Sequence, residues 1–160
     1  MTSRITTTPF ALLLLAAITC APAACQPTSK PLGPSDRLSL RLRSVSDDHR
    51  YTYFELDSQG RLSYAGGEQA ARREAGPVMT LTADQLQHVR QIVRRHNLLS
   101  VPSPDVKKHD HIKYELYLKS EGWRGRTLHA TDDTLPGVRE LHDYLFSLQA
   151  EKRYHIPRLQ

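Results

Sequence analysis

Apolar and polar residues alternate over two stretches of this 160-residue chain. The longer stretch covers residues 112–119, and the shorter one covers residues 38–43. A repeat of two residues is typical of a β-strand that buries one face and exposes the other. Because parallel sheets are usually buried on both faces, the alternation predicts an antiparallel sheet with one apolar face and one polar face.

Turn sequences connect further strand-forming segments into two hairpins. Residues 57–60 are polar, end in glycine, and separate the aromatic segment 51–56 from a strand candidate over 61–64. Residues 120–122 likewise follow the longer alternating stretch and precede a partner strand over 123–130. Polar residues and glycine between strand-forming segments are typical of hairpin turns.

Two helices are predicted from apolar residues at helical spacing. Thr82 and Gln85 have the spacing of a capping box, which satisfies free backbone N–H groups where a helix begins. Asn97 is suited to the end of that helix, and Pro136 is suited to the first turn of the other. The apolar stripes are Leu86, Val89, Ile92 and Val93 in the first helix, and Val138, Leu141, Leu145 and Leu148 in the second.

Each hairpin precedes one helix, so a β-β-α unit occurs twice after a single strand. The order β-β-β-α-β-β-α predicts an α+β fold in which both amphipathic helices cover one face of an antiparallel sheet. Residues 66–76 are polar and are predicted to form an exposed loop, and residues 78–81 are a candidate for a short extra strand. The uncovered face of the sheet is expected to carry Lys113, Glu115, Tyr117 and Lys119.

The first 24 residues have the features of an export signal. Arg4 gives a basic start, residues 10–18 are a short apolar segment, and small residues follow. Residues 21–23, Ala-Pro-Ala, match the pattern that a general signal peptidase accepts, which would release a soluble secreted protein. Alternatively, Cys25 follows two alanines and resembles the cysteine of a bacterial lipoprotein box, which is acylated and becomes the new N-terminus. Cys20 fits that box less well.

We expect acylation at Cys25 because a tether-like segment follows it. Residues 25–36 contain three prolines and no aromatic residue, a composition typical of a semi-extended linker. The predicted organisation is a signal peptide over 1–24, a tether over 25–36, a single domain over 37–150 and a flexible basic tail over 151–160. The expected location is the cell envelope, periplasmic or on the outer surface, with a lipid anchor in the membrane.

Composition excludes several classes of protein. The formal charge of +5 is mild and dispersed, which argues against a nucleic-acid partner. The two cysteines, Cys20 and Cys25, both precede the domain, so the domain can hold neither a disulfide framework nor a cysteine-based zinc site. The apolar stretches are all shorter than the roughly 18 residues that span a bilayer.

The sequence marks no active site. It lacks a Gly-x-Ser-x-Gly elbow and a convergent set of acid, base and nucleophile, so a domain without enzymatic activity or cofactor is predicted. His109 and His111 are two residues apart, a spacing that points both imidazoles to one side of a strand. A stable metal site needs a third ligand, which the sequence does not mark, so no metal is predicted.

Four residues are candidates for binding a protein partner. Trp123 is the only tryptophan, and Arg124 and Arg126 follow it just after a hairpin turn. Tryptophan and arginine are enriched at interface hot spots, and Tyr117 is expected on the uncovered sheet face. Together with the leader, these residues predict an exported, lipid-anchored envelope protein whose domain binds an unknown protein.

Residues 81–148 resemble the emfourin-like small domains. The resemblance lies in Leu-Thr-Ala-Asp-Gln-Leu at 81–86, Asn-Leu-Leu-Ser-Val-Pro at 97–102, Tyr-Glu-Leu at 114–116 and His-Ala-Thr-Asp-Asp at 129–133. Emfourin-like proteins inhibit thermolysin-like metalloproteases, so the resemblance implies an α+β fold and, as the alternative function, protease inhibition. It covers under half of the chain and identifies no inhibitory residue. The lipoprotein-like leader departs from the emfourin pattern.

Overall fold

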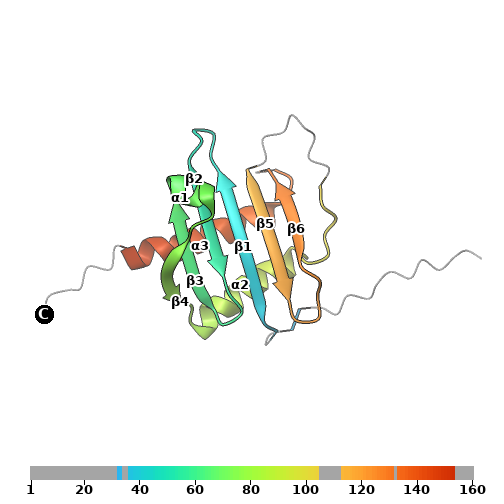
Figure 1. The fold of residues 1–160 in the computed structure, drawn as a ribbon. Helices are drawn as coiled ribbons and strands as arrows, with labels where there is room; N and C mark the ends of the chain where they lie inside the picture. The colour runs from blue at the N-terminus through green and yellow to red at the C-terminus, as the bar shows by residue number, and fades with distance from the viewer. Residues whose placement is uncertain (1–31, 34–35, 105–112, 132, 154–160) are drawn as a thin grey trace, which may run out of the picture.

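A computed structural model of the chain describes residues 32–33, 36–104, 113–131 and 133–153 (Figure 1). One antiparallel sheet has the strand order β4-β3-β2-β1-β5-β6. Its strands are β1 (Leu38–Val45), β2 (Tyr51–Leu56), β3 (Arg61–Gly66), β4 (Gly76–Thr80), β5 (Tyr114–Ser120) and β6 (Arg126–Ala130). The helices are α1 (Gly67–Arg72), α2 (Ala83–Arg95) and α3 (Pro136–Arg153). The α+β fold predicted from the alternation is confirmed.

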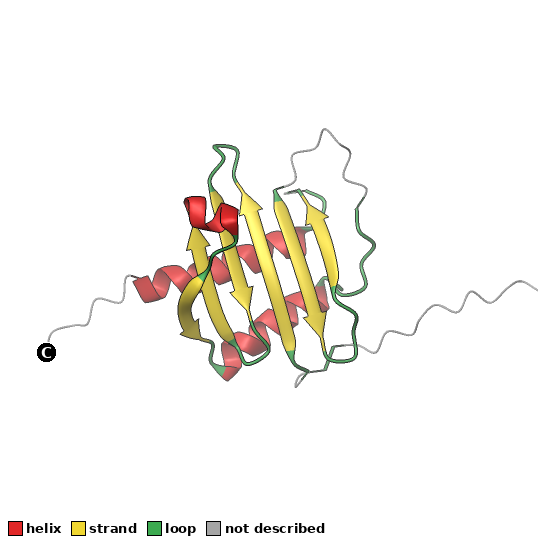
Figure 2. Ribbon diagram, in the orientation of Figure 1, coloured by secondary structure: helices red, strands yellow, loops and turns green. Residues whose placement is uncertain are grey.

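The two long helices, α2 and α3, lie on one face of the sheet (Figure 2). Strand β1 buries Leu40 and Leu42 on that face, and the alternation sends Arg41 to the opposite face. The apolar stripes of both helices meet the buried strand residues in one core, whose members run from Leu32 to Leu148. The core is therefore contained within the part of the chain that follows the predicted leader.

Strand β1 occupies a central position, with the β2–β3 hairpin on one side and the β5–β6 hairpin on the other. In the register of the sheet, Arg41 lies opposite Glu55 of β2 and Tyr117 of β5. Arg43 lies opposite Tyr53 and Glu115 in the same way. Side chains from three strands that are distant in sequence are thus brought into adjacent rows on the face away from α2 and α3.

The start of α2 has the capping box that the sequence predicts. The Thr82 hydroxyl accepts a hydrogen bond from the Gln85 N–H at 3.3 Å, and Gln85 Oε1 accepts one from the Thr82 N–H at 2.9 Å. Asn97 follows the helix with a left-handed φ of 50°. Near the start of α3, a Cβ on Gly137 would lie 2.4 Å from the His96 Cβ, so glycine permits the close approach of the two helices.

The expectation of a loop over residues 66–76 is wrong, because this segment contains α1. The helix lies on the opposite face of the sheet from α2 and α3 (Figure 2). Ala70 is fully buried there against Tyr53 and Ala65. A single alanine gives no apolar periodicity, so pattern reading misses such a helix. Strand β4 follows α1, and the chain order becomes β-β-β-α-β-α-β-β-α.

Strand β4 forms one edge of the sheet and is short and irregular. Its pairing with β3 shifts register between Leu62 and Ser63. Pro77 has no backbone N–H to offer, and the ammonium of Lys152 in α3 donates a hydrogen bond to the Val78 carbonyl. These features leave few free pairing groups along this edge.

The chain is already packed at Leu32, inside the segment expected to be a tether. Leu32 is 4% exposed and belongs to the main core. Asp36 accepts a hydrogen bond from the Gly33 N–H at 2.7 Å, and the Arg90 Nε donates to the Asp36 carbonyl at 3.2 Å. Residues 1–31 and 154–160, which include Cys25, lie outside the described residues.

Candidate functional site

The face of the sheet opposite α2 and α3, which we call the open face, carries the most distinctive set of polar and aromatic side chains. It is formed by alternate residues of five strands. They are Ser39, Arg41 and Arg43 of β1, Tyr51, Tyr53 and Glu55 of β2, Ser63 and Ala65 of β3, Glu115, Tyr117 and Lys119 of β5, and Thr127 and His129 of β6. Glu115, Tyr117 and Lys119 lie where the sequence predicts them.

Arg41 joins two strands across the open face. Its Nε donates to Glu55 Oε1 at 3.0 Å, and its guanidinium carbon lies 5.9 Å from the centroid of the Tyr117 ring. The hydrogen bond and the charge of Glu55 raise the pKa of Arg41. Because the Arg41 side chain is 60% exposed, this pair contributes little to stability and leaves the guanidinium accessible to a partner.

A second row is organised around Glu115. Arg73 follows α1 and donates to both carboxylate oxygens of Glu115, at 2.9 and 3.0 Å. Arg43 lies 3.9 Å from the same carboxylate, and its guanidinium carbon is 4.9 Å from the centroid of the Tyr51 ring. Two cations thus share one carboxylate. The buried Nε of Arg43 has no hydrogen-bond partner among the described residues.

Gly125 gives the Tyr117 side chain its position. A Cβ built on Gly125 would lie 2.2 Å from the Tyr117 hydroxyl oxygen and 2.7 Å from the Cζ to which it is attached. Any larger residue at position 125 would therefore displace the phenol ring. Glycine here leaves room for the end of the Tyr117 side chain beside the connection between β5 and β6.

The open face is hollowed at the end where β1 begins. The groove has a volume of about 600 Å³, and its polar lining includes Arg37, Ser39, Arg41, Glu55, Asp57, Ser58, Tyr117, Lys119 and Glu121. Basic and acidic side chains are interleaved along it. A groove of this kind suits a partner that presents both signs of charge.

Asp57 fixes the turn that borders the groove. Its Oδ1 accepts hydrogen bonds from the N–H groups of Gln59 and Arg61, at 2.8 and 3.0 Å, and its Oδ2 accepts one from Arg61 Nε at 2.5 Å. Desolvation by burial opposes ionisation, but these hydrogen bonds and the charge of Arg61 outweigh it and lower the pKa of Asp57.

The four residues that the sequence singled out for binding do not form one patch. Tyr117 lies on the open face, whereas Trp123 is half-buried and packs against the core on the helix side of the sheet. Arg124 is exposed. Arg126 donates to the carbonyl oxygens of the segment after α2, those of Leu99 at 3.0 Å and Val101 at 2.6 Å. Desolvation by burial lowers the pKa of Arg126, and its position holds β6 to that segment.

Sequence reasoning missed Arg41, Arg43 and Tyr51 as members of the site. Tyr53 points to the same face but is only 4% exposed, because it packs against Ala70 of α1. The signal was available for β1, because its arginines alternate with Leu38, Leu40 and Leu42, which occupy the core. For β2 the signal was weaker, since Tyr-Thr-Tyr-Phe places aromatic residues on both faces.

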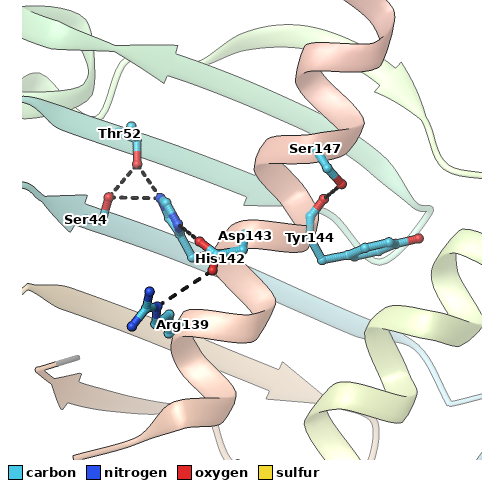
Figure 3. A network of polar contacts seen from close by, with 7 residues as sticks. All are labelled: Ser44, Thr52, Arg139, His142, Asp143, Tyr144 and Ser147. Atoms are coloured by element: carbon cyan, nitrogen blue, oxygen red, sulfur yellow. Dashed lines mark hydrogen bonds and ion pairs between the residues drawn. The ribbon is translucent and has the colours of Figure 1, made fainter. Parts of the chain in front are cut away.

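Beneath the sheet, a polar cluster combines a serine, a histidine and an aspartate (Figure 3). His142 of α3 has its Nε2 3.1 Å from both the Ser44 and the Thr52 hydroxyl oxygens, which are 2.6 Å apart. Its Nδ1 lies 3.1 Å from Asp143 Oδ1. The Asp143 carboxylate can accept from an Nδ1–H, and each hydroxyl can either donate to Nε2 or accept from it.

This cluster is a structural bridge rather than a catalytic arrangement. Ser44 is 8% exposed, and its hydroxyl is held between Thr52 and the imidazole. The His142 ring is packed edge-on against Phe54 and Tyr114, with centroids 5.8 and 5.5 Å away. A nucleophile needs access to its substrate, whereas this hydroxyl lies between the sheet and α3. The cluster ties α3 to β1 and β2.

Two further properties concern metals and membranes. In the part of the chain that the structure describes, no group of three His, Cys, Asp or Glu side chains could hold a metal ion. His109 and His111 lie outside that part. None of the described helices combines the length and apolar character needed to cross a bilayer.

Comparison with known proteins gives no match, either to a protein family or to a curated protein. The features of the open face that bear on binding are therefore its own contacts, charges and exposed aromatic rings.

Proposed function

We propose that the protein is a non-enzymatic binding module of the cell envelope, anchored by a lipid on Cys25, and that its open face binds a protein partner. The observation that carries this proposal is the pattern on the open face. Tyrosine and arginine side chains from β1, β2 and β5 lie in adjacent rows that α2 and α3 do not cover. Tyrosine and arginine are the residues enriched, with tryptophan, at protein interfaces.

The balance of charge favours a protein over a nucleic acid. Arg41 is paired with Glu55, and Arg43 and Arg73 share Glu115. The carboxylates of Glu55 and Glu115 lie among these cations and would repel a phosphate backbone, which reduces the gain from such a contact. A protein surface can present both signs of charge in the matching order, which gives specificity and orientation.

The shape of the open face favours a polypeptide over a small metabolite. Small-molecule sites are concave and mostly apolar, whereas the groove over β1, β2 and β5 has charged side chains along its length. A second hollow of about 310 Å³, lined by Arg43, Tyr51 and Glu115 among others, lies further along the same face. A peptide segment or loop of a partner protein fits such a surface.

A site-specific crosslink tests the open face directly. A photoreactive amino acid placed at Lys119, which is exposed on the open face, should crosslink a discrete partner in intact envelopes. The same amino acid at Arg139, which is exposed on α3, should not. Equal crosslinking from the two positions would contradict the proposal.

Two glycine substitutions supply a matched pair for that experiment. Gly125→Ala displaces the Tyr117 ring, whereas a Cβ on Gly76 meets nothing within 4 Å and Gly76 has no positive φ. In the Lys119 crosslinking protein, Gly125→Ala should lower the yield about thirtyfold, because loss of an interface hot spot costs about 2 kcal/mol. Gly76→Ala should leave the yield unchanged. Equal yields from the two variants would contradict a role for the Tyr117 position.

Anchoring and the alternative function have their own tests. The mature protein should partition into detergent, and Cys25→Ser should make it soluble; an unmodified chain beginning near residue 24 would exclude acylation. The resemblance to emfourin-like domains makes a thermolysin-like metalloprotease the first partner to try. Stoichiometric loss of protease activity on titration with the protein would identify the partner class, and a flat response would remove protease inhibition.

A further inference from the structure

The domain has a second charged surface, at the end where Leu32 packs into the core. We call this the Trp123 surface, and it consists of Leu32, Arg90, Arg94 and Trp123, together with Arg124, which follows Trp123 in the chain. Leu32, Arg94 and Trp123 line one hollow of about 190 Å³ together with the end of α2. Arg90 is tied to the same segment through the Asp36 carbonyl. The Trp123 surface is thus built around the point where the predicted tether joins the domain.

The cations of the Trp123 surface differ from those of the open face in their partners. Arg90 donates to a backbone carbonyl, as does the neighbouring Arg126, so the positive charge of each is not neutralised by a carboxylate. Among the described residues, no carboxylate forms an ion pair with the side chain of Arg94 or Arg124. These cations therefore differ from Arg41, Arg43 and Arg73 of the open face, each of which lies beside a carboxylate.

The carboxylates near this surface do not cancel its charge. Asp36 accepts the Gly33 N–H at 2.7 Å and holds the incoming chain in place. Glu121 is exposed in the turn after β5. Two carboxylates thus stand beside the three arginines of the Trp123 surface and the neighbouring Arg126. An excess of positive charge attracts an anionic surface within about a Debye length, roughly 10 Å at moderate ionic strength.

Trp123 gives the surface an amphipathic side chain. The indole is half-buried and packs on the core, with its remaining part beside Leu32 and the C-terminal end of α2. Tryptophan is enriched at the boundary between lipid and water, where one part of the ring is apolar and the N–H stays hydrated. A tryptophan flanked by unpaired arginines is a combination suited to phospholipid headgroups.

The length of the tether places this surface next to a membrane. Leu32 is seven positions after Cys25, and a fully extended chain spans at most about 3.5 Å per position, so the two residues can be no more than roughly 25 Å apart. An acyl group on Cys25 would therefore keep the Trp123 surface close to the bilayer. A basic patch is a recognised second membrane signal beside a lipid anchor.

We propose that the Trp123 surface docks on a bilayer containing anionic phospholipids and thereby fixes the orientation of the domain. This inference deepens the proposed function, since it assigns the membrane contact to one end of the domain and leaves the open face for the protein partner. The docking itself depends on the arginines and Trp123, and it can be measured without the acyl group.

The test uses the chain from Gln26 onward, which contains the whole core, from Leu32 to Leu148. It is mixed with vesicles of equal parts phosphatidylglycerol and phosphatidylcholine, or of phosphatidylcholine alone. We expect sedimentation with the anionic vesicles only, together with a blue shift of the emission of Trp123, the single tryptophan. Raising the salt to about 0.5 M should release the protein.

A charge-matched pair of variants locates the contact. Arg94→Glu with Arg124→Glu should weaken vesicle binding about tenfold or more, because each basic residue near an anionic bilayer adds to the attraction. Arg50→Glu with Arg72→Glu makes the same change in net charge on the β1–β2 turn and α1, and should weaken binding by less than about twofold. Circular dichroism checks that both proteins are folded.

Several results would overturn the inference. They are an absence of binding to the anionic vesicles, equal binding to phosphatidylcholine alone, and an equal loss in the two double variants. Binding to polyglutamate but not to vesicles would assign the surface to an acidic protein and would also overturn it. Failure of detergent partitioning by the mature protein would instead contradict acylation, so the two proposals fail separately.

Discussion

The two faces of the sheet are made from the same strands but differ in almost every physical property. On the helix-covered face, Leu40, Leu116 and Leu118 are at most 1% exposed. On the open face, the alternate positions of the same strands carry Arg41, Glu115 and Tyr117, all partly or largely solvent-accessible. Alternate residues of the same strands can therefore have different roles. Those on the covered face stabilise the fold, and those on the open face are available for recognition.

The energetics follow the same division. Burial of apolar area contributes about 25 cal/mol per Å², so the covered face supplies most of the stabilising free energy. Exposed ion pairs such as Arg41 with Glu55 contribute between about 0 and 1 kcal/mol. Substitutions on the covered face should therefore lower the free energy of unfolding, whereas substitutions on the open face should mainly lower partner binding. Three substitutions are expected to span this range, from the largest effect on stability to the smallest.

The largest effect is expected at the centre of the covered face. Leu116→Ala removes a side chain that is fully buried between β1, β6 and the helices, so it should lower the free energy of unfolding by about 2–5 kcal/mol. Urea denaturation followed by circular dichroism measures the loss. Lys119→Ala, in the same strand but exposed, is the control and should change stability by less than about 0.5 kcal/mol. Similar losses of unfolding free energy in the two variants would contradict the inference that the covered face supplies most of the stability.

An intermediate effect is expected at Asp57, in the turn between β2 and β3. Asp57→Ala removes the acceptor of two backbone N–H groups and should cost about 1 kcal/mol at neutral pH. Because the fold lowers the pKa of Asp57 below its unfolded value of about 3.9, the stabilisation is present above that pH and is lost as the pH falls through the lower folded value.

Urea titrations of the wild type and Asp57→Ala at pH 7 and pH 2 measure this dependence. The difference between the two proteins should shrink at the lower pH. Asp57→Asn is the control, since its amide oxygen can still accept the backbone N–H groups while its charge is lost. A difference that stays constant with pH would show that the ionised carboxylate contributes no stability.

The smallest effect on stability is expected on the open face, where the effect on binding should be large. Arg41→Ala removes an exposed guanidinium that contacts Glu55 and Tyr117, and should change the free energy of unfolding by less than about 1 kcal/mol. In the Lys119 crosslinking experiment, the same change should reduce partner capture about tenfold. Unchanged capture would remove Arg41 from the proposed interface.

Much of the fold was predictable because its signals are local. Alternation gives β1 and β5, the capping box of Thr82 and Gln85 gives the start of α2, and the leucine stripe gives α3. Helix α1 was not predictable, because it is attached to the sheet through the contact of one small residue, Ala70, with Tyr53 of β2, and a single alanine gives no periodic pattern. The early packing of Leu32 was missed for the same reason, because a lone leucine among prolines has no pattern.

The candidate site was only partly predictable. Tyr117 could be placed on the open face from its parity, but its neighbours depend on the strand order, which puts β1 between β2 and β5. Trp123 and Arg126 follow the same turn as Arg124, yet the structure sends them to different surroundings. Residue type suggests an interface, whereas the register of the sheet decides which residues share one.

The edge formed by β4 has a consequence for how the molecule behaves at high concentration. Sheet edges are templates on which chains can join into fibrils. The proline at position 77, the register shift beside Leu62 and the lysine bound to the Val78 carbonyl interrupt that template. Copies held in a two-dimensional layer would meet edge to edge far more often than copies in free solution. The interruptions along β4 should prevent the edge strands of such copies from pairing into a polymer.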